Sequence, residues 1–196
     1  MRVALASGNR HKLREVRTLF PGWEVEPLDM SGAPEETGET FYANARAKAR
    51  FAHAVAGAGT WVLGEDSGLE VDGLQGRPGI RSARYAGPEA TDEANVQQLL
   101  AELGAAAGAA RRARYVSELV LVSPEGRELR GSGTLAGRIA EEPRGSGGFG
   151  YDPVFVPDGE THTVGELGDA WKARNSHRAR AARALAETVG TAPEEG

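Results

Sequence analysis

The sequence predicts an α/β fold with a mixed β-sheet, and three observations carry this prediction. Apolar residues repeat at helical spacing in some segments and alternate with polar residues in others, so helices and strands interleave along the chain. Residues 115–123 and 128–136 flank the turn residues Pro124-Glu125-Gly126, which is the pattern of an antiparallel hairpin. The length of 196 residues suits one domain and leaves little room for a second independent core, although two lobes that share one sheet remain possible.

The first half of the chain alternates strand and helix patterns. Turn residues bound these segments, and Thr40 is a natural helix cap. We expect a strand over 2–6, a turn at 7–9, a helix over 10–20, a strand near 25–28, a loop over 31–39, a helix over 40–55, and strands over 61–64 and 69–72 that are separated by a turn at 65–68.

The second half begins with a glycine-rich stretch and then holds the hairpin. We expect a loop with one helical turn near Ser82 over 73–87, a helix over 91–103, a surface connection over 105–110, the hairpin with its second strand continuing to 140, a glycine loop over 145–150, a strand over 153–156, a helix over 176–189 and a disordered tail over 191–196.

Composition excludes several classes of protein. The chain has no cysteine, which rules out thiol catalysis, cysteine-ligated zinc and a disulfide scaffold. Its formal net charge of -5 argues against broad binding to nucleic acid polymers or to anionic membranes. No apolar run approaches the roughly 20 residues that span a bilayer, so we expect a cytoplasmic protein.

Lysine is rare in this chain, which makes the positions of the lysines informative. Only three of the 23 basic residues are lysines, namely Lys12, Lys48 and Lys172. Where arginine is the usual cation, a lysine hints that the place needs a compact point charge.

Two predicted helices begin with basic residues. The segment Ser7-Gly8-Asn9-Arg10-His11-Lys12 leaves a strand and opens a helix, where backbone N–H groups and the helix dipole attract anions. Lys172, Arg174, His177 and Arg178 similarly surround the start of the last helix. Both helix starts are therefore candidate anion sites, and the alternative is that their basic side chains extend into water.

The middle of the chain supplies a candidate metal site. Asp66 follows an apolar strand, and one or two carboxylates together with substrate phosphates are the usual ligands of Mg²⁺. Lys48 lies on a polar stripe with Thr40 and Asn44, from which it could reach a phosphate near Lys12. The alternatives are an Asx turn at Asp66-Ser67-Gly68 and a Lys48 side chain that only extends from the buried helix face to water.

The glycine loop at 145–150 matches G-x-G-x-x-G but is not a dinucleotide fingerprint, because a strand follows it instead of a helix. A flexible loop that presents Phe149 and Tyr151 offers aromatic faces on which a flat base can stack.

Five ordered motifs together resemble the inosine triphosphate pyrophosphatase family, the dITP/XTP pyrophosphatases. They cover nearly the whole chain: Ser-Gly-Asn-x-x-Lys-x-x-Glu at 7–15, Thr-Phe-x-x-Asn-Ala-x-x-Lys-Ala at 40–49, the run from Asp66 to Tyr85, Gly-Phe-Gly-Tyr-Asp-Pro-Val-Phe at 148–155, and Ser-His-Arg at 176–178. One departure is Glu65, where many bacterial members have aspartate.

The resemblance implies a fold, a reaction and site residues. The fold would be one elongated mixed-sheet domain over 1–196 with two lobes and a central cleft, assembled as a homodimer. The reaction would be Mg²⁺-dependent hydrolysis of ITP, dITP or XTP to the monophosphate and pyrophosphate. Asp66 would activate water and bind the metal with Glu35, or with its neighbour Glu36. Substrate would contact Ser7, Gly8, Asn9, Arg10, His11, Lys12, Lys48, Ser67, Phe149, Gly150, Tyr151, Asp152, Lys172, His177 and Arg178.

Residue chemistry gives reasons for these roles. Two lysines, a helix start and a magnesium ion can neutralise a triphosphate, and a carboxylate can take the proton of the attacking water. Donors on His177 and Arg178 would favour a 6-keto purine over adenine. Two other classes keep the same features: a nucleotide-binding sensor without turnover, and a metal-dependent phosphatase that acts on a smaller phosphorylated compound.

Overall fold

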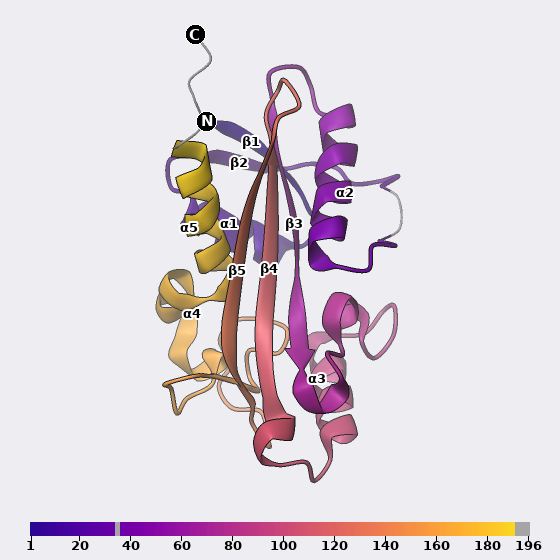
Figure 1. Ribbon diagram of the computed structural model, residues 1–196, viewed down its shortest axis with the longest axis vertical. Coiled ribbons are helices and arrows are strands. Elements are labelled where there is room, and N and C mark those ends of the chain that lie inside the picture. The colour runs from indigo at the N-terminus through magenta and orange to yellow at the C-terminus, as the bar shows by residue number, and fades with distance from the viewer. Residues whose placement is uncertain (34–35, 191–196) are drawn as a thin grey trace. The chain divides into compact units, whose positions relative to one another are not determined.

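The structure is a computed structural model that describes residues 1–33 and 36–190 (Figure 1). The predicted ligand Glu35 and the predicted tail 191–196 lie outside these residues. The chain forms two compact units. Unit 1 takes its described residues from Met1–Asp66, Ser117–Gly133 and Arg178–Gly196, and unit 2 consists of Ser67–Val116 and Thr134–His177.

One sheet has the strand order β2-β1-β3-β4-β5-β6. Strand β1 pairs in parallel with β2 and with β3, whereas β5 pairs antiparallel with β6. The strands are β1 (Arg2–Ala6), β2 (Glu24–Pro27), β3 (Trp61–Val71), β4 (Arg112–Val122), β5 (Glu128–Ile139) and β6 (Phe155–Pro157). The mixed sheet confirms the predicted α/β class, and the adjacent strands β4 and β5 form the predicted hairpin.

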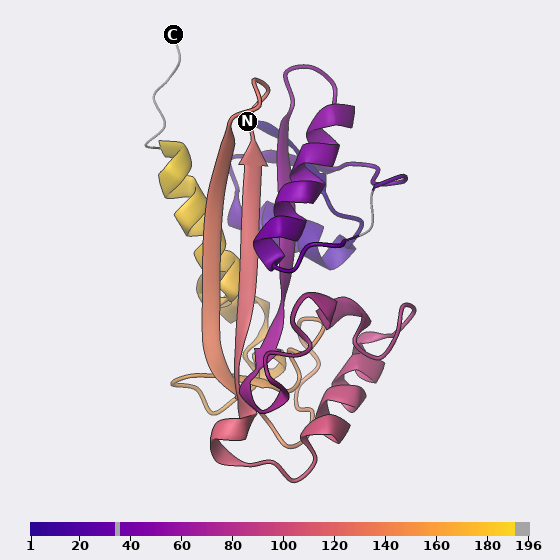
Figure 2. The same ribbon diagram turned by 45° about the vertical axis from the view of Figure 1, so that its right-hand side comes forward.

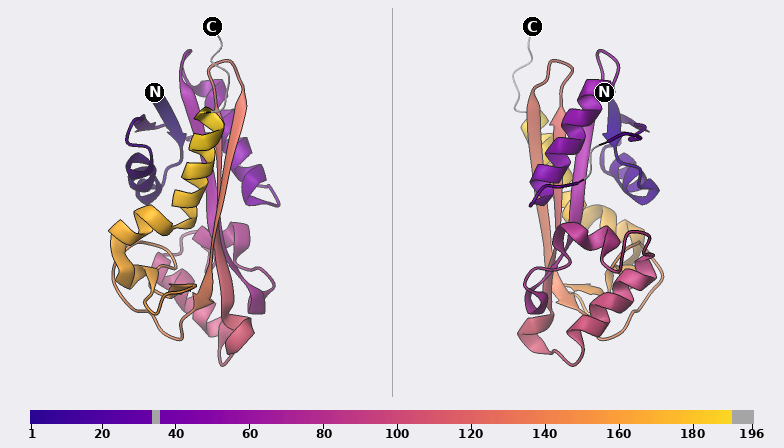
Figure 3. Two further views of the ribbon diagram at one scale, coloured as in Figure 1. Left: turned by 60° about the vertical axis from the view of Figure 1, so that its left-hand side comes forward. Right: turned by 90° about the vertical axis from the view of Figure 1, so that its right-hand side faces the viewer.

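Unit 1 has a separate apolar core on each face of its strands. Leu63, Leu119 and Leu121 pack with α1 (Arg10–Leu19) and α5 (His177–Gly190), whereas Val62, Val120 and Val122 face α2 (Phe41–Val55). This alternation follows from the strand geometry, in which successive side chains point to opposite faces. Helix α2 lies over β3 in Figure 2, and α5 runs beside β5 in the left panel of Figure 3.

Glycines allow these two helices to approach the strands closely. A side chain at Gly64 would collide with the backbone of Ala45, and one at Gly131 would collide with the backbone of Ala181. The alanines on α2 and α5 serve the same purpose, because a small side chain brings the helix axis near the sheet. The functional side chains of α2 therefore start close to β3.

Unit 2 has one apolar core. It gathers Leu69 and Val71 of β3, Leu99 of α3 (Asp92–Leu103), Phe155 of β6 and Val164 of α4 (Val164–Asn175). Short 3-10 turns cover Asp72–Leu74, Gly79–Arg84 and Gly108–Arg111, which agrees with the predicted loop and its helical turn near Ser82.

The predicted helix starts are confirmed. Asn9 caps α1, Thr40 caps α2 and Thr91 caps α3, each through a side-chain oxygen that accepts a backbone N–H of the first turn. None of the described helices is long and apolar enough to cross a membrane.

One prediction about elements is wrong, and one helix is missing from the predictions. The expected turn at 65–68 does not exist, because β3 runs unbroken from Trp61 to Val71. Helix α4 was not predicted, since Gly165 and Gly168 interrupt its apolar pattern and Gly168 has non-helical dihedral angles. Its start does carry a readable signal, the capping box formed by Thr163 and Glu166. The two lobes with a central cleft that the resemblance implies stay a prediction.

Candidate active site

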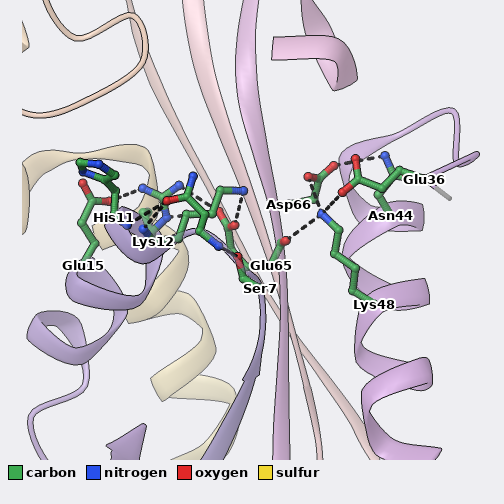
Figure 4. A network of polar contacts seen from close by, with 11 residues as sticks. Ser7, His11, Lys12, Glu15, Glu36, Asn44, Lys48, Glu65 and Asp66 are labelled. Atoms are coloured by element: carbon green, nitrogen blue, oxygen red, sulfur yellow. Dashed lines mark hydrogen bonds and ion pairs between the residues drawn. The ribbon is translucent and has the colours of Figure 1, made fainter. Parts of the chain in front are cut away.

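Three of the predicted phosphate and metal residues, Lys12, Lys48 and Asp66, have their charged groups around the middle of β3 in unit 1 (Figure 4). Glu65 and Asp66 are neighbours on this strand, so their side chains point to opposite faces of the sheet. Figure 4 shows Lys12 reaching from α1 on one side and Lys48 reaching from α2 on the other. We call these residues, with Glu15, Glu36, Asn44 and Arg178, the charged cluster.

Glu65 is the buried centre of the α1 side. Its Oε2 lies 2.6 Å from Lys12 Nζ, and its Oε1 accepts from Arg178 Nη2 at 3.0 Å and Nε at 3.2 Å. Glu15 of α1 also pairs with Arg178. Burial alone would raise the pKa of Glu65, but the attraction of Lys12 and Arg178 outweighs it and holds this pKa well below its usual value. The carboxylate is therefore firmly ionised.

Asp66 is the centre of the α2 side. Its Oδ1 lies 3.0 Å from Lys48 Nζ, and its Oδ2 accepts from Asn44 Nδ2 at 3.2 Å. Lys48 also lies 2.5 Å from Glu36 Oε1 and donates to the carbonyl oxygen of Glu65 at 3.3 Å. Burial raises the pKa of the Asp66 carboxyl, and Lys48 opposes this increase. A raised pKa makes Asp66 a better proton acceptor than an ordinary aspartate.

The start of α1 holds the remaining predicted phosphate binders. Asn9 Oδ1 accepts the N–H groups of His11 at 2.8 Å and of Lys12 at 3.2 Å, and Ser7 Oγ accepts the N–H of Asn9. Gly8, Arg10 and His11 are exposed. An anion at this helix start would meet the N-terminal end of the helix dipole and three basic side chains.

The donor set fits a divalent cation. Lys48 Nζ already lies against one oxygen of Glu36 and one of Asp66, so these carboxylates share a place that a positive charge occupies. Carboxylates are the oxygen ligands that Mg²⁺ takes from proteins when substrate phosphates and waters supply the rest. Among residues 1–33 and 36–190 no group of three or more acidic, histidine or cysteine side chains could hold a metal alone.

The predicted base-binding residues of the glycine loop lie in unit 2. Asp152 is buried, and its Oδ2 accepts from Lys172 Nζ at 2.5 Å and from the N–H of Phe149 at 2.9 Å. Lys172 Nζ also lies 4.2 Å from the centre of the Phe149 ring. Gly148 has a positive φ of 75°, and a side chain there would collide with the Asp152 carboxylate.

Tyr115 joins two of the predicted residues. Its ring stacks on His177 with centroids 4.5 Å apart and planes inclined by 11°, and its hydroxyl donates to Asp152 Oδ1 at 3.2 Å. We call Tyr115, Phe149, Asp152, Lys172 and His177 the aromatic cluster. It combines one buried ion pair with stacked rings, which suits a flat and largely uncharged ligand.

Other predicted residues are placed differently from expectation. Tyr151 does not present its ring to a base, because it is 3% exposed in the core of unit 2 and its hydroxyl donates to the Ser82 carbonyl. Gly150 donates its N–H to Asp92 at 2.7 Å. Ser67 is half-buried on β3 instead of lying in a turn, which excludes the Asx turn as the explanation of Asp66. Arg178 binds carboxylates of the charged cluster.

Sequence reasoning missed roles for four residues. Glu15, Asn44 and Glu65 belong to the charged cluster, and Tyr115 belongs to the aromatic cluster. Glu15 follows Lys12 by three residues on α1, which placed both on one helix face. The local sequence around Tyr115 carried no such signal, since it reads as an ordinary strand.

Comparisons with known proteins identify the family to which this chain is similar. The model of the Ham1 family matches residues 3–188. The chain is 43% identical over 198 residues to the dITP/XTP pyrophosphatase of Bdellovibrio bacteriovorus, which covers 97% of this chain and 98% of that protein. It is 46% identical over 200 residues to the dITP/XTP pyrophosphatase of Symbiobacterium thermophilum, covering 100% of this chain and 98% of that protein.

Solved structures share the fold. The Ham1 protein of Coxiella burnetii has a TM-score of 0.84 and 37% identity, with 98% of this chain and 100% of that chain covered. The structure described as a nucleoside-triphosphatase and dITP/XTP pyrophosphatase from Mycobacterium abscessus has a TM-score of 0.73 and 40% identity, with 94% and 97% covered.

Proposed function

This chain belongs to the Ham1 family, and on that premise we propose that it is a nucleoside-triphosphate pyrophosphatase that hydrolyses non-standard purine nucleotides such as dITP, ITP and XTP. The family confirms the resemblance that the five sequence motifs carry. The products are the nucleoside monophosphate and pyrophosphate, and the reaction removes damaged purines from the nucleotide pool.

One observation carries the proposal: a buried aspartate, Asp66, lies on β3 with a lysine on each side of the sheet. Lys12 and Lys48 each contact one of the adjacent carboxylates Glu65 and Asp66. Positioning and charge neutralisation supply most of the catalysis in phosphoryl transfer, and compact lysine charges beside a proton acceptor provide both. Lys12, Lys48 and the α1 start from Ser7 to His11 take the triphosphate.

The charge balance of the cluster calls for a divalent cation. Three cations, Lys12, Lys48 and Arg178, face four carboxylates, those of Glu15, Glu36, Glu65 and Asp66. The charged cluster by itself therefore carries a net negative charge, which a metal ion accompanying the polyphosphate would offset. We infer that Asp66 together with Glu35 or Glu36 would hold Mg²⁺, which would supply positive charge to neutralise the phosphates.

The chain's own residues then move one proton. The Lys48 ammonium moves from the carboxylates of Glu36 and Asp66 to phosphate oxygens, which leaves Asp66 Oδ1 available to accept a proton. Water bonds to the α phosphorus, the bond from that phosphorus to the α–β bridging oxygen breaks, and Asp66 takes the proton of the water. Asn44 keeps hold of Oδ2 throughout. The raised pKa of Asp66 favours this proton transfer.

The aromatic cluster recognises the base. Phe149 stacks on the purine, and Lys172, Asp152 and His177 supply polar contacts around it, with Gly150, Tyr151 and Ser67 completing the loop and strand that shape the subsite. A 6-keto oxygen accepts hydrogen bonds from these donors. The amino group of adenine cannot accept them and would leave the donors unpaired, so adenine nucleotides are disfavoured. Arg178 holds Glu15 and Glu65 in this structure, and its predicted contact to the base requires it to leave them.

The direct test is pyrophosphate release from a panel of ITP, dITP, XTP, GTP and ATP, with Mg²⁺ and with a chelator. We expect pyrophosphate from ITP, dITP and XTP but not from ATP, and only with the metal. GTP also carries a 6-keto oxygen, so its rate shows whether a further contact excludes guanine. Orthophosphate as the sole product would identify a phosphatase, and binding without any product would identify a sensor. A homodimer and a cytoplasmic location stay predictions.

A further inference from the structure

Two helices of this chain begin with the same pattern, Thr-x-x-Ala-Asn. Helix α2 starts at Thr40-Phe41-Tyr42-Ala43-Asn44, and α3 starts at Thr91-Asp92-Glu93-Ala94-Asn95. In each case the threonine hydroxyl accepts the alanine N–H, at 3.1 Å in α2 and 3.2 Å in α3. Each asparagine is 2% exposed, although asparagine is a poor residue for a helix interior.

The two asparagines share one contact. Asn95 Oδ1 accepts the N–H of Ala86 at 2.8 Å, and Asn44 Oδ1 accepts the N–H of Gly38 at 2.9 Å. Each amide therefore fixes the loop that precedes its helix. A side chain at Gly38 would collide with Asn44 Oδ1, so this approach requires glycine.

Their second contacts differ. Asn95 Nδ2 donates to the backbone carbonyl of Ala83 at 3.2 Å and remains within the loop. Asn44 Nδ2 donates to Asp66 Oδ2 at 3.2 Å, on a strand 22 residues away. Because one partner of the Asn44 amide is a donor and the other a carboxylate, the orientation of the amide is determined.

We propose that Asn44 is a positioning residue for the reaction: its single amide ties the loop at Glu36–Gly38 to the Asp66 carboxylate and so sets the spacing of the acidic side chains that receive the metal. The inference rests on the proposed function. Glu36 and Asp66 both contact Lys48 Nζ. Gly38 follows Glu36 by two residues, so the Asn44 amide is a second link between the segment of Glu36 and the Asp66 carboxylate. Mutation of a residue that hydrogen-bonds to a metal-binding carboxylate commonly lowers metal affinity or activity by about 10–100-fold.

Three variants test this role. Asn44→Ala removes both contacts, Asn44→Asp keeps an acceptor for Gly38 but places a carboxylate against Asp66, and Asn95→Ala removes the matched amide of α3. The readouts are the melting temperature, kcat and KM for ITP, the Mg²⁺ concentration at half-maximal rate, and Mn²⁺ binding measured by electron paramagnetic resonance with pyrophosphate present.

We expect both α2 variants to lower kcat and weaken Mn²⁺ binding by 10-fold or more, with KM for ITP changed less than kcat. Asn95→Ala should lower the melting temperature as Asn44→Ala does but leave kcat and Mn²⁺ binding within about twofold of the wild type. If Asn44→Ala does not fold, Asn44→Asp decides, since it retains the loop contact.

Equal behaviour of the α2 variants and Asn95→Ala in kcat and Mn²⁺ binding would overturn the proposal, as would unaltered Mn²⁺ binding by Asn44→Asp. A wild-type protein that binds Mn²⁺ with pyrophosphate but releases no pyrophosphate from any nucleotide would instead refute the proposed function, and the Mn²⁺ titrations would still decide the role of Asn44.

Discussion

The charged cluster of unit 1 and the aromatic cluster of unit 2 bury polar groups in different ways. In unit 1, Glu65 is fully buried and neutralised by Lys12 and Arg178. In unit 2, Asp152 accepts from the ammonium of Lys172, from the neutral hydroxyl of Tyr115 and from a backbone N–H. The first cluster is a network of several charges, and in the second the ion pair of Asp152 and Lys172 lies beside aromatic rings.

Because of this difference, we expect substitutions in the two clusters to affect different properties of the protein. Removing one charge from a buried network leaves its partners uncompensated, so stability should suffer most in unit 1. Removing a ring face leaves no buried charge behind, so the effect in unit 2 should fall on ligand affinity.

The largest expected effect is on catalysis. Asp66→Asn keeps the shape of the side chain but cannot accept a proton, so the rate of pyrophosphate release should fall about 10³-fold. The assay is single-turnover hydrolysis of ITP by the variant and the wild type, with circular dichroism to verify folding. A variant that retains more than a tenth of the rate would show that another group takes the proton.

The largest expected effect on stability is at Glu65. Glu65→Gln leaves Arg178 and Lys12 without their shared carboxylate, and breaking a buried pair in this way costs about 3–5 kcal/mol of unfolding free energy. Glu118→Gln is the matched control, because Glu118 is also buried but its partner Arg130 is half exposed and can be solvated. If both variants lost the same unfolding free energy in urea, breaking the buried network would cost no more than breaking the half-exposed pair, which would contradict this prediction.

A pH series sharpens the same point. The folded-state pKa of Glu65 lies below its usual value of 4.5, because Lys12 and Arg178 outweigh the effect of burial. The stabilisation from this carboxylate is therefore complete above about pH 4.5 and is lost as the pH falls towards the folded-state pKa. Between pH 6 and about pH 3 the wild type should lose more unfolding free energy than Glu65→Gln. Parallel curves for the two proteins would contradict this account.

The smallest expected effect is in unit 2. Phe149→Leu keeps an apolar side chain but removes the ring, and base–aromatic stacking contributes about 1–3 kcal/mol, so KM for ITP should rise about tenfold with kcat nearly unchanged. The measurement is steady-state kinetics, with Phe20→Leu as a control ring that stacks on Trp23 in unit 1. A fall in kcat without a change in KM would place Phe149 outside base binding.

Local patterns in the sequence determined most elements and their boundaries. The Asn9, Thr40 and Thr91 caps, the hairpin and the alternating strands of unit 1 follow from the side-chain period and from side chains that bond to their own neighbouring backbone. The family motifs also identified Lys12, Lys48 and Asp66, which the structure joins through Glu65 and Lys48. These features were predictable because they depend on residues close together in the chain.

Tertiary structure alone decided the rest. The stretch from Glu65 to Gly68 contains typical turn residues, yet it is a strand, because neighbouring strands and the lysines of two helices satisfy its backbone and carboxylates. The same Thr-x-x-Ala-Asn sequence gives Asn44 a carboxylate partner and Asn95 a carbonyl partner. The local sequence places each asparagine amide against the loop before its helix. Contacts between distant parts of the chain decide which other group the amide meets.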